Sequence, residues 1–173
     1  MRDGAANPLA EELVKTLSLR GKVIAMAESC TAGMASDLIA CISGASKVFW
    51  GGFVCYTPGA KEKMLGIPLT LIEKYGAVSR PVALAMAEGA LEKSGADWAL
   101  SITGLAGPGD DGSGLPVGTV WIGIAGRDEE SPKLSWSEAK NYFFSGSRND
   151  VRKAAAEAAL NELLERILTV RRF

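Results

Sequence analysis

Residues 22–33 have the sequence KVIAMAESCTAG, in which an apolar run is followed directly by small and hydroxyl-bearing residues. The apolar part, residues 22–27, is bounded by a turn and predicts a short buried strand. The part that follows, residues 27–33, is typical of the start of a helix. We therefore expect a strand that turns into a helix across residues 27–33, with Ser29 at the mouth of that helix. In α/β proteins such turns lie at the carboxyl end of the sheet, where functional sites are found.

Strand-like and helix-like patterns alternate along most of the 173 residues. Further strands are expected at residues 48–56, 97–103, 117–125 and 133–144. The last of these is polar and alternating, which favours an antiparallel or edge strand. Helices are expected at residues 8–20, after Ser29 as far as Ser43, after Thr57, after Ser79 and at residues 147–168. The alternation predicts one α/β domain over residues 1–173, a three-layer α/β/α sandwich with a mixed, mostly parallel sheet.

Composition and charge argue against several classes of protein. The net charge is -1 and basic residues do not cluster except at residues 171–172, so we expect no binding to nucleic acid. No run approaches ~20 apolar residues and no leader pattern is visible, so we expect no membrane segment and a cytoplasmic location. The three cysteines show no paired spacing and are expected to be free thiols, and a zinc site is not expected. Apolar strands and an alanine-rich last helix permit a homodimer, although core packing explains them equally well.

The chain contains no histidine, so no imidazole can activate a nucleophile at Ser29. Lysine and tyrosine are the main alternatives. Lys61 is expected near the start of the helix capped by Thr57, where the helix dipole and any burial lower the pKa of its amine and favour the neutral base. Tyr56, at the end of the preceding strand, can relay or orient the proton. The alternative is that Lys61 is an ordinary exposed lysine.

The backbone after Ser29 is expected to offer hydrogen-bond donors. The N–H groups of Cys30, Thr31, Ala32 and Gly33 would lack intrahelical partners and can bind a carbonyl oxygen as it becomes an oxyanion. Ala32 and Gly33 are small enough to let a substrate approach. Two alternatives stay open. Ser29 or Thr31 can serve only as a helix cap, and the Cys30 thiol, whose pKa a helix N-terminus lowers, can be a rival nucleophile unless it packs against the sheet.

A glycine-rich segment, SITGLAGPGDDGSG at residues 101–114, follows the expected third strand. Its glycines, including Gly104 and Gly107, can let successive N–H groups converge on an anion, and Thr103 adds a hydroxyl. The segment matches neither a P-loop nor a GxGxxG motif. A plain flexible loop is the alternative interpretation.

Charged residues near this segment are further candidate ligands. Arg148, at the start of the last helix, is a candidate phosphate ligand because its planar fork suits phosphate oxygens. Arg152, one turn later, can assist it or pair with Glu157. Asp110 and Asp111 can hold Mg²⁺, although such residues are also ordinary in turns.

Together these motifs closely resemble the C-terminal domain of the CinA family, the competence/damage-inducible proteins. The matching segments follow the family's order over nearly the whole chain. They are AESCT at 27–31, GFVCY at 52–56 with Lys61, GAVS at 76–79, SITGLAGP at 101–108, PVGTV at 116–120, and FSG at 144–146 followed by Arg148, Val151 and Arg152. Two positions depart from the family pattern: Ala32 where glycine is usual, and Ser147 where asparagine or an acidic residue is common.

The resemblance implies an activity and roles for these residues. Domains of this family hydrolyse the carboxamide of nicotinamide mononucleotide (NMN), giving nicotinic acid mononucleotide and ammonia. By resemblance, Ser29 is the nucleophile and Lys61 and Tyr56 activate it. Thr103, the loop after it and Arg148 are expected to bind the ribose phosphate, and no metal or organic cofactor is implied.

The resemblance also leaves one alternative function open. Many members carry a larger N-terminal domain, and this chain is expected to be the stand-alone form. Some members are poorly active, so the domain can instead be a catalytically silent nucleotide-binding or regulatory module of the competence/damage-inducible type. Such a module would bind a pyridine nucleotide as a signal and act through partner proteins.

Overall fold

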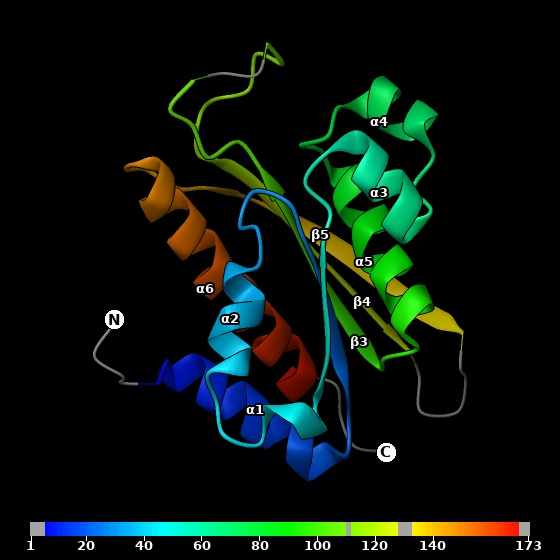
Figure 1. The fold of residues 1–173 in the computed structure, drawn as a ribbon, viewed down its shortest axis with the longest axis vertical. Helices are drawn as coiled ribbons and strands as arrows, with labels where there is room; N and C mark the ends of the chain where they lie inside the picture. Colours follow the sequence, from blue (N-terminus) through cyan, green and yellow to red (C-terminus); the bar gives the residue numbers. More distant parts are fainter. Residues whose placement is uncertain (1–5, 110–111, 128–132, 170–173) are drawn as a thin grey trace.

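The computed structural model describes residues 6–109, 112–127 and 133–169, which form one five-stranded sheet with helices on both faces (Figure 1). The strands are β1 (Ile24–Glu28), β2 (Phe49–Val54), β3 (Trp98–Gly104), β4 (Thr119–Arg127) and β5 (Leu134–Phe143). Their order across the sheet is β2-β1-β3-β4-β5. β1 pairs in parallel with β2 and β3, while β4 is antiparallel to both β3 and β5. Four strands therefore share one direction, and the predicted mixed, mostly parallel sheet is confirmed.

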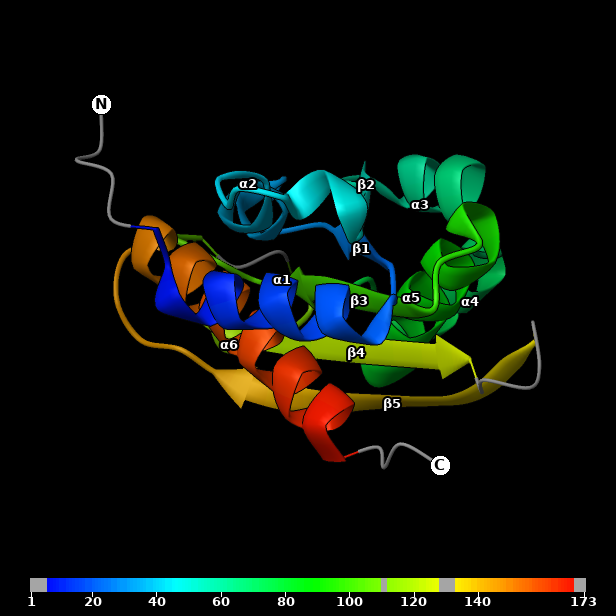
Figure 2. The same ribbon diagram turned by 90° about the horizontal axis from the view of Figure 1, so that it is seen from below.

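The helices form two layers on opposite faces of the sheet (Figures 1 and 2). One layer contains α1 (Pro8–Arg20), α2 (Met34–Ala40) and α6 (Arg148–Thr169). The other contains α3 (Pro58–Leu65), α4 (Leu69–Tyr75) and α5 (Arg80–Ser94), and a short 3₁₀ helix (Ala45–Lys47) precedes β2. The three-layer α/β/α sandwich is thus confirmed, and α4 is an element that the sequence analysis did not predict.

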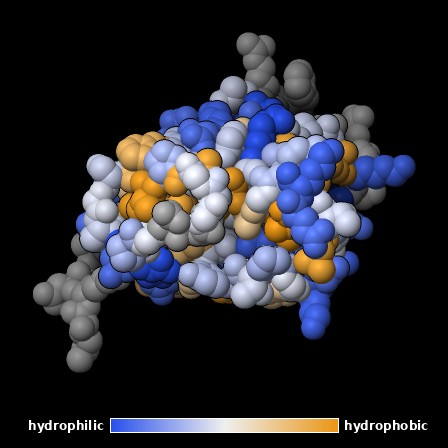
Figure 3. Space-filling view, turned by 90° about the horizontal axis from the view of Figure 1, so that it is seen from above, coloured by the Kyte–Doolittle hydropathy of each residue, from blue (hydrophilic) through white to orange (hydrophobic). Residues whose placement is uncertain are grey.

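The interior strand β1 is buried along its whole length because it lies between β2 and β3 and between two helical layers. Separate hydrophobic clusters cover the two faces of the sheet, one under α1, α2 and α6 and one under α3 and α5. Such two-sided burial explains why β1 is a continuous apolar run. Its carboxyl end delivers Glu28 and Ser29 to the end of the sheet that Figure 3 views from above, where apolar and polar residues lie side by side.

β2 carries a bulge beside its two glycines. Ile24 pairs with Phe49 and Ala25 pairs with Gly51, so Trp50 is skipped in the register. Gly52 is needed for a different reason, because a Cβ atom at this position would lie 2.3 Å from Ser36 Oγ of α2. The missing side chain lets α2 pack closely against the sheet beside the carboxyl end of β1.

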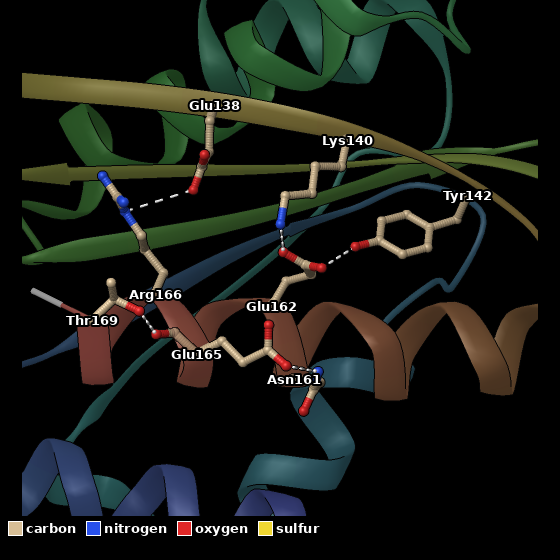
Figure 4. A network of polar contacts seen from close by, with 8 residues as sticks. All are labelled: Glu138, Lys140, Tyr142, Asn161, Glu162, Glu165, Arg166 and Thr169. Carbon is tan, nitrogen blue, oxygen red and sulfur yellow. Dashed lines mark hydrogen bonds and ion pairs between the residues drawn. The ribbon is translucent and has the colours of Figure 1, made fainter.

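α6 is fixed to the edge strand β5 by a polar network (Figure 4). Glu162 accepts a hydrogen bond from Lys140 Nζ at 2.6 Å and another from the Tyr142 hydroxyl. Arg166 Nε lies 3.6 Å from Glu138 Oε1, and Arg166 Cζ lies over the Trp136 ring, 4.1 Å from its centroid. β5 is antiparallel and at the edge, as predicted. The network holds the helix whose first two turns carry Arg148 and Arg152.

Within the described part of the chain, no helix combines the length and apolar character needed to cross a membrane.

Candidate active site

Lys61 and Ser29 lie in direct contact at the carboxyl end of the sheet. Lys61 Nζ is 2.8 Å from Ser29 Oγ, 2.9 Å from the carbonyl oxygen of Cys55 and 3.4 Å from that of Tyr56. An ammonium group can donate to all three oxygens. A neutral amine has two N–H groups, which suit the two carbonyls, and its lone pair is then left to accept the Ser29 proton. The arrangement therefore fits a serine nucleophile beside a lysine base.

The surroundings of Lys61 favour that neutral amine. Its side chain is 1% exposed, and its hydrogen-bond acceptors are an uncharged hydroxyl and two carbonyls. Among the described residues, none of the ion pairs involves this amine. Burial lowers the pKa of Lys61, while the nearby thiols of Cys55 and Cys30 act weakly in the opposite direction. The prediction of a buried lysine with a lowered pKa is confirmed, and the exposed alternative is wrong.

Local backbone structure explains how Lys61 reaches Ser29. Cys55 N donates to the carbonyl of Glu28 at 2.9 Å, so the chain leaving β2 stays beside the end of β1. Thr57 then caps α3, accepting from the Ala60 N–H at 3.2 Å, and Lys61 follows in the first turns of that helix. The predicted Thr57 cap is confirmed.

Glu28 is a residue whose importance the sequence analysis missed. Its carboxylate is fully buried and accepts hydrogen bonds from the N–H groups of Gly33, Ala35 and Ser36 at 2.8–3.1 Å and from Ser36 Oγ at 2.6 Å. A carboxylate at the N-terminus of a helix complements its dipole and its unpaired donors. The available signal was an acidic residue at the end of an otherwise apolar strand, directly before Ser29.

Residues 29–33, which we call the nucleophile turn, do not form the expected first turn of a helix. Ala32 N donates to the Ser29 carbonyl at 3.1 Å, and both Ala32 (φ 51°) and Gly33 (φ 95°) are left-handed. Two successive left-handed residues cannot continue a right-handed helix, so α2 begins only at Met34. The expected helix therefore follows residues 27–33, as predicted, and only the expectation that residues 30–33 are its first turn is wrong.

The turn also narrows the set of free backbone donors. The N–H groups of Ala32 and Gly33 are occupied by the Ser29 carbonyl and by Glu28, so the expectation that they bind an oxyanion is wrong. Within the described residues, the N–H groups of Cys30 and Thr31 have no acceptor. These two donors belong to the two residues that follow Ser29 and are the candidate oxyanion site.

Cys30 is placed as a packed residue. Its side chain is 5% exposed, and burial raises the pKa of the thiol to about 11. The thiolate form needed for attack is therefore scarce near neutral pH. The expectation of a lowered pKa is wrong because desolvation outweighs the effect of the nearby donors.

Tyr56 lies beside the dyad through its backbone, not its hydroxyl. The side chain is 51% exposed, and its hydroxyl accepts a hydrogen bond from Arg148 Nη2 at 2.8 Å. The structure records no contact of this hydroxyl with Ser29 or Lys61, whereas the Tyr56 carbonyl faces both side chains. A proton relay through the ring is therefore not assembled in this arrangement.

The glycine-rich segment after β3 is partly used for packing. Thr103 is buried, and its hydroxyl donates to the Ala77 carbonyl at 2.8 Å. Gly104 belongs to β3, and a Cβ atom there would lie 2.7 Å from Val120 Cγ2. Gly107 is left-handed, and its carbonyl accepts from Arg148 Nη1 at 2.6 Å. Arg148 thus joins this loop to Tyr56 at the mouth of the site.

Asp110 and Asp111, considered as possible Mg²⁺ ligands, lie outside the described residues.

Arg152 makes contacts that sequence reasoning did not predict. Its Nε donates to the Cys30 carbonyl and its Nη2 to the Thr31 carbonyl, each at 3.0 Å, and its Nη1 donates to Asn149 Oδ1 at 3.1 Å. The suggested pairing with Glu157 is absent from the ion pairs of the described residues. Its position one turn after Arg148 on α6 was the only sequence signal.

Comparison with known proteins identifies the fold and the family of this chain. The fold is that of a crystal structure of the competence damage-inducible protein A (ComA) from Klebsiella pneumoniae. That structure matches with a TM-score of 0.89 and 28% identity, covering 97% of this chain and 100% of that one. The CinA C-terminal domain model matches residues 6–167, and the chain therefore belongs to the CinA C-terminal domain family.

Two relatives differ in how much of their length the chain covers. A CinA-like protein of Anaeromyxobacter sp. (strain K) is 44% identical over 155 residues, which are 90% of this chain and 36% of that protein. The chain thus spans about a third of the length of this relative. The nicotinamide-nucleotide amidohydrolase PncC of Shigella flexneri is 40% identical over 168 residues, which are 97% of this chain and 98% of that protein.

Proposed function

We propose that this protein is a nicotinamide-nucleotide amidohydrolase that converts NMN to nicotinic acid mononucleotide and ammonia. The observation that carries the proposal is the 2.8 Å contact between Lys61 Nζ, a buried amine with a lowered pKa, and Ser29 Oγ. The substrate is inferred from the PncC relative of Shigella flexneri, whose length the chain covers almost completely.

The first half of the proposed reaction forms an acyl-enzyme. Neutral Lys61 accepts the Ser29 proton while Oγ attacks the carboxamide carbon. The N–H groups of Cys30 and Thr31 stabilise the oxyanion. The Lys61 ammonium then returns its proton to the amide nitrogen, the C–N bond breaks, and ammonia leaves.

The second half releases the product by the same groups. Lys61, neutral again, takes a proton from water, and the resulting hydroxide attacks the ester carbon. Collapse of the tetrahedral intermediate breaks the bond to Ser29 Oγ, which recovers its proton from Lys61. Since these residues supply nucleophile, base and oxyanion donors, the proposed reaction requires no metal and no organic cofactor.

Residues at the mouth are proposed to orient the nucleotide. Arg148 is held between Tyr56 and Gly107, so its guanidinium lies at the surface of the site where a ribose phosphate can reach it. In this proposal Tyr56 contributes its carbonyl to Lys61 and its hydroxyl to Arg148. Thr103 and Gly104 support the loop from behind. The protein is proposed to act in the cytoplasm on a small nucleotide, as a monomer or a homodimer.

The test is ammonia release from NMN by the pure protein. We expect turnover by the wild type, a loss of at least about 10³-fold in Ser29→Ala, and near-normal turnover in Cys30→Ala, because the Cys30 thiol is not ionised near neutral pH. Normal turnover in Ser29→Ala would refute the serine nucleophile, and loss in Cys30→Ala alone would assign the role to the thiol. Tight NMN binding without product would favour the silent nucleotide-binding module.

A further inference from the structure

Among the residues that the structure describes, Arg152 is the arginine whose guanidinium binds the main chain of the nucleophile turn. Two of its nitrogens bind the successive carbonyls of Cys30 and Thr31, and a third is bound by Asn149. We infer that Arg152 is a positioning residue, which sets the direction of the Cys30 and Thr31 N–H groups toward the reacting carbonyl. This inference rests on the proposed function, because it assigns the support of that function's oxyanion site.

The planarity of the peptide bond connects the arginine to the donors. In a trans peptide the C=O and the following N–H point in opposite directions. Holding the Cys30 carbonyl toward α6 therefore directs the Thr31 N–H away from α6. The Ser29 carbonyl is turned toward Ala32 N, so the Cys30 N–H is directed away from that bond. These are the same two N–H groups that lack an acceptor among the residues described.

The turn needs support from outside because its backbone is unfavourable. Ala32 is the only described non-glycine residue with positive φ, and Gly33 follows it in the same region. Left-handed geometry is unfavourable for a non-glycine residue because it brings Cβ too close to a backbone carbonyl oxygen. Two charged groups hold the turn from opposite ends of its peptide dipoles. The Glu28 carboxylate accepts hydrogen bonds from the N–H groups of Gly33 and Ala35. The Arg152 guanidinium donates to the carbonyls of Cys30 and Thr31, which precede Ala32.

Only an arginine can make this set of contacts. Nε and Nη2 lie on one edge of the planar guanidinium and reach two adjacent carbonyls together, whereas a lysine amine is a single point. Because the Arg152 nitrogens are already bound, the contacts favour a role in positioning over direct binding of the substrate phosphate. The Glu162 network on the same helix keeps α6 against β5 and so fixes the base of the side chain.

The experiment compares Arg152→Lys and Arg152→Met with Lys153→Met. Lys153 is the next residue on α6, is exposed, and serves as a matched control for the loss of one positive charge. For NMN turnover we expect kcat to fall about 10- to 100-fold in both Arg152 variants, with KM changed by less than about threefold. The control should behave as the wild type. A change confined to KM, or full kcat in Arg152→Lys, would overturn the inference.

A second readout separates this inference from the choice of substrate. A fluorophosphonate reacts with an activated serine and develops charge on an oxygen in the same oxyanion site. We expect Ser29 to be labelled at least about tenfold more slowly in Arg152→Lys than in the wild type. Equal labelling rates would overturn the positioning role. A wild type that is labelled but releases no ammonia from NMN would refute the proposed substrate alone, and the labelling ratio would still decide the inference. Should Arg152→Met fail to fold, Arg152→Lys decides by itself.

Discussion

Lys61 and Lys140 are two lysines of the same chain with opposite surroundings. Lys61 is buried against a hydroxyl and two carbonyls, whereas Lys140 has a side chain that is 52% exposed and binds the Glu162 carboxylate at 2.6 Å. Burial lowers the pKa of Lys61, and the hydrogen bond to Glu162 raises the pKa of Lys140. A lysine amine thus becomes a base when burial removes its solvation and no carboxylate stabilises its charged form.

The Glu162 network and the site around Ser29 also differ in how their charged groups are paired. The network around Glu162 ties α6 to β5 and has its charges paired (Figure 4). The site around Ser29 holds one buried charged residue, Glu28, that is fully engaged by N–H groups, and one buried amine that is not paired with a carboxylate. The paired network thus fastens α6 to the sheet, and the unpaired amine is left available as a base.

The largest effect is expected from removing the unpaired amine. Lys61→Met should lower kcat for NMN by about 10³-fold or more, because it removes the proposed general base. The free energy of unfolding should stay equal or increase, since an apolar chain of similar length replaces a desolvated amine. Lys140→Met is the matched control and should keep full turnover. A loss of activity in Lys140→Met as large as that in Lys61→Met would contradict the comparison.

The pH dependence of turnover sharpens the same contrast. The base must be neutral, so kcat/KM should rise about tenfold per pH unit below the pKa of Lys61 and level off below the ordinary ~10.4 of lysine. A steady-state profile from pH 5 to 10 measures this. Lys140→Met should leave the profile in place. A profile that keeps rising up to the ordinary lysine value would show that burial does not tune the amine.

The two lysines should also affect stability with opposite signs. The Lys61 pKa is lowered in the folded state, so the unfolded chain binds more protons above the folded value, and stability rises with pH up to ~10.4. The Lys140 pKa is raised, so its contribution is complete below ~10.4 and is lost as pH increases further. Denaturant unfolding of the wild type and of each Met variant between pH 8 and 11 measures both signs. Parallel curves for the two variants would contradict the assignment.

The smallest effect is expected from opening the paired network. Glu162→Ala removes the acceptor of Lys140 and Tyr142 and should cost about 1–2 kcal/mol of unfolding free energy. Glu162→Gln retains an acceptor and should cost less. Chemical denaturation checks both values, and a variant as stable as the wild type would show that the network does not hold α6.

Sequence periodicity predicted the layers and strands because each element carries its own local signal. The buried run before Glu28, the Thr57 cap and the alternating edge strand are such signals. The Thr57 side chain accepts from the N–H group of Ala60 at 3.2 Å, as predicted. α4 has seven residues, no capping side chain and a single buried residue, Ile72. It escaped prediction because it lacks the apolar face at helical spacing that revealed α2, which is equally short and also has no capping side chain.

The site was predictable only in part, for a physical reason. The proximity of Ser29 and Lys61 follows from the parallel pairing of β1 with β2, which brings both strand ends to one edge of the sheet. The positive φ of Ala32 and the contacts of Arg152 over 121 and 122 residues of separation depend on tertiary packing, which no local pattern reports. The Tyr56 hydroxyl was expected to contact the Ser29–Lys61 pair but binds Arg148. No local pattern reports this partner, because Arg148 lies 92 residues away in the sequence.

The most direct measurement is an NMR titration of the lysine side-chain nitrogens in ¹⁵N-labelled protein, with the Lys61 resonance assigned by its loss in Lys61→Met. The account predicts that Lys61 Nζ loses its proton well below the pH at which the other lysines titrate, and that Lys140 titrates above them. A Lys61 resonance that titrates together with the exposed lysines would contradict the claim that an uncharged amine activates Ser29.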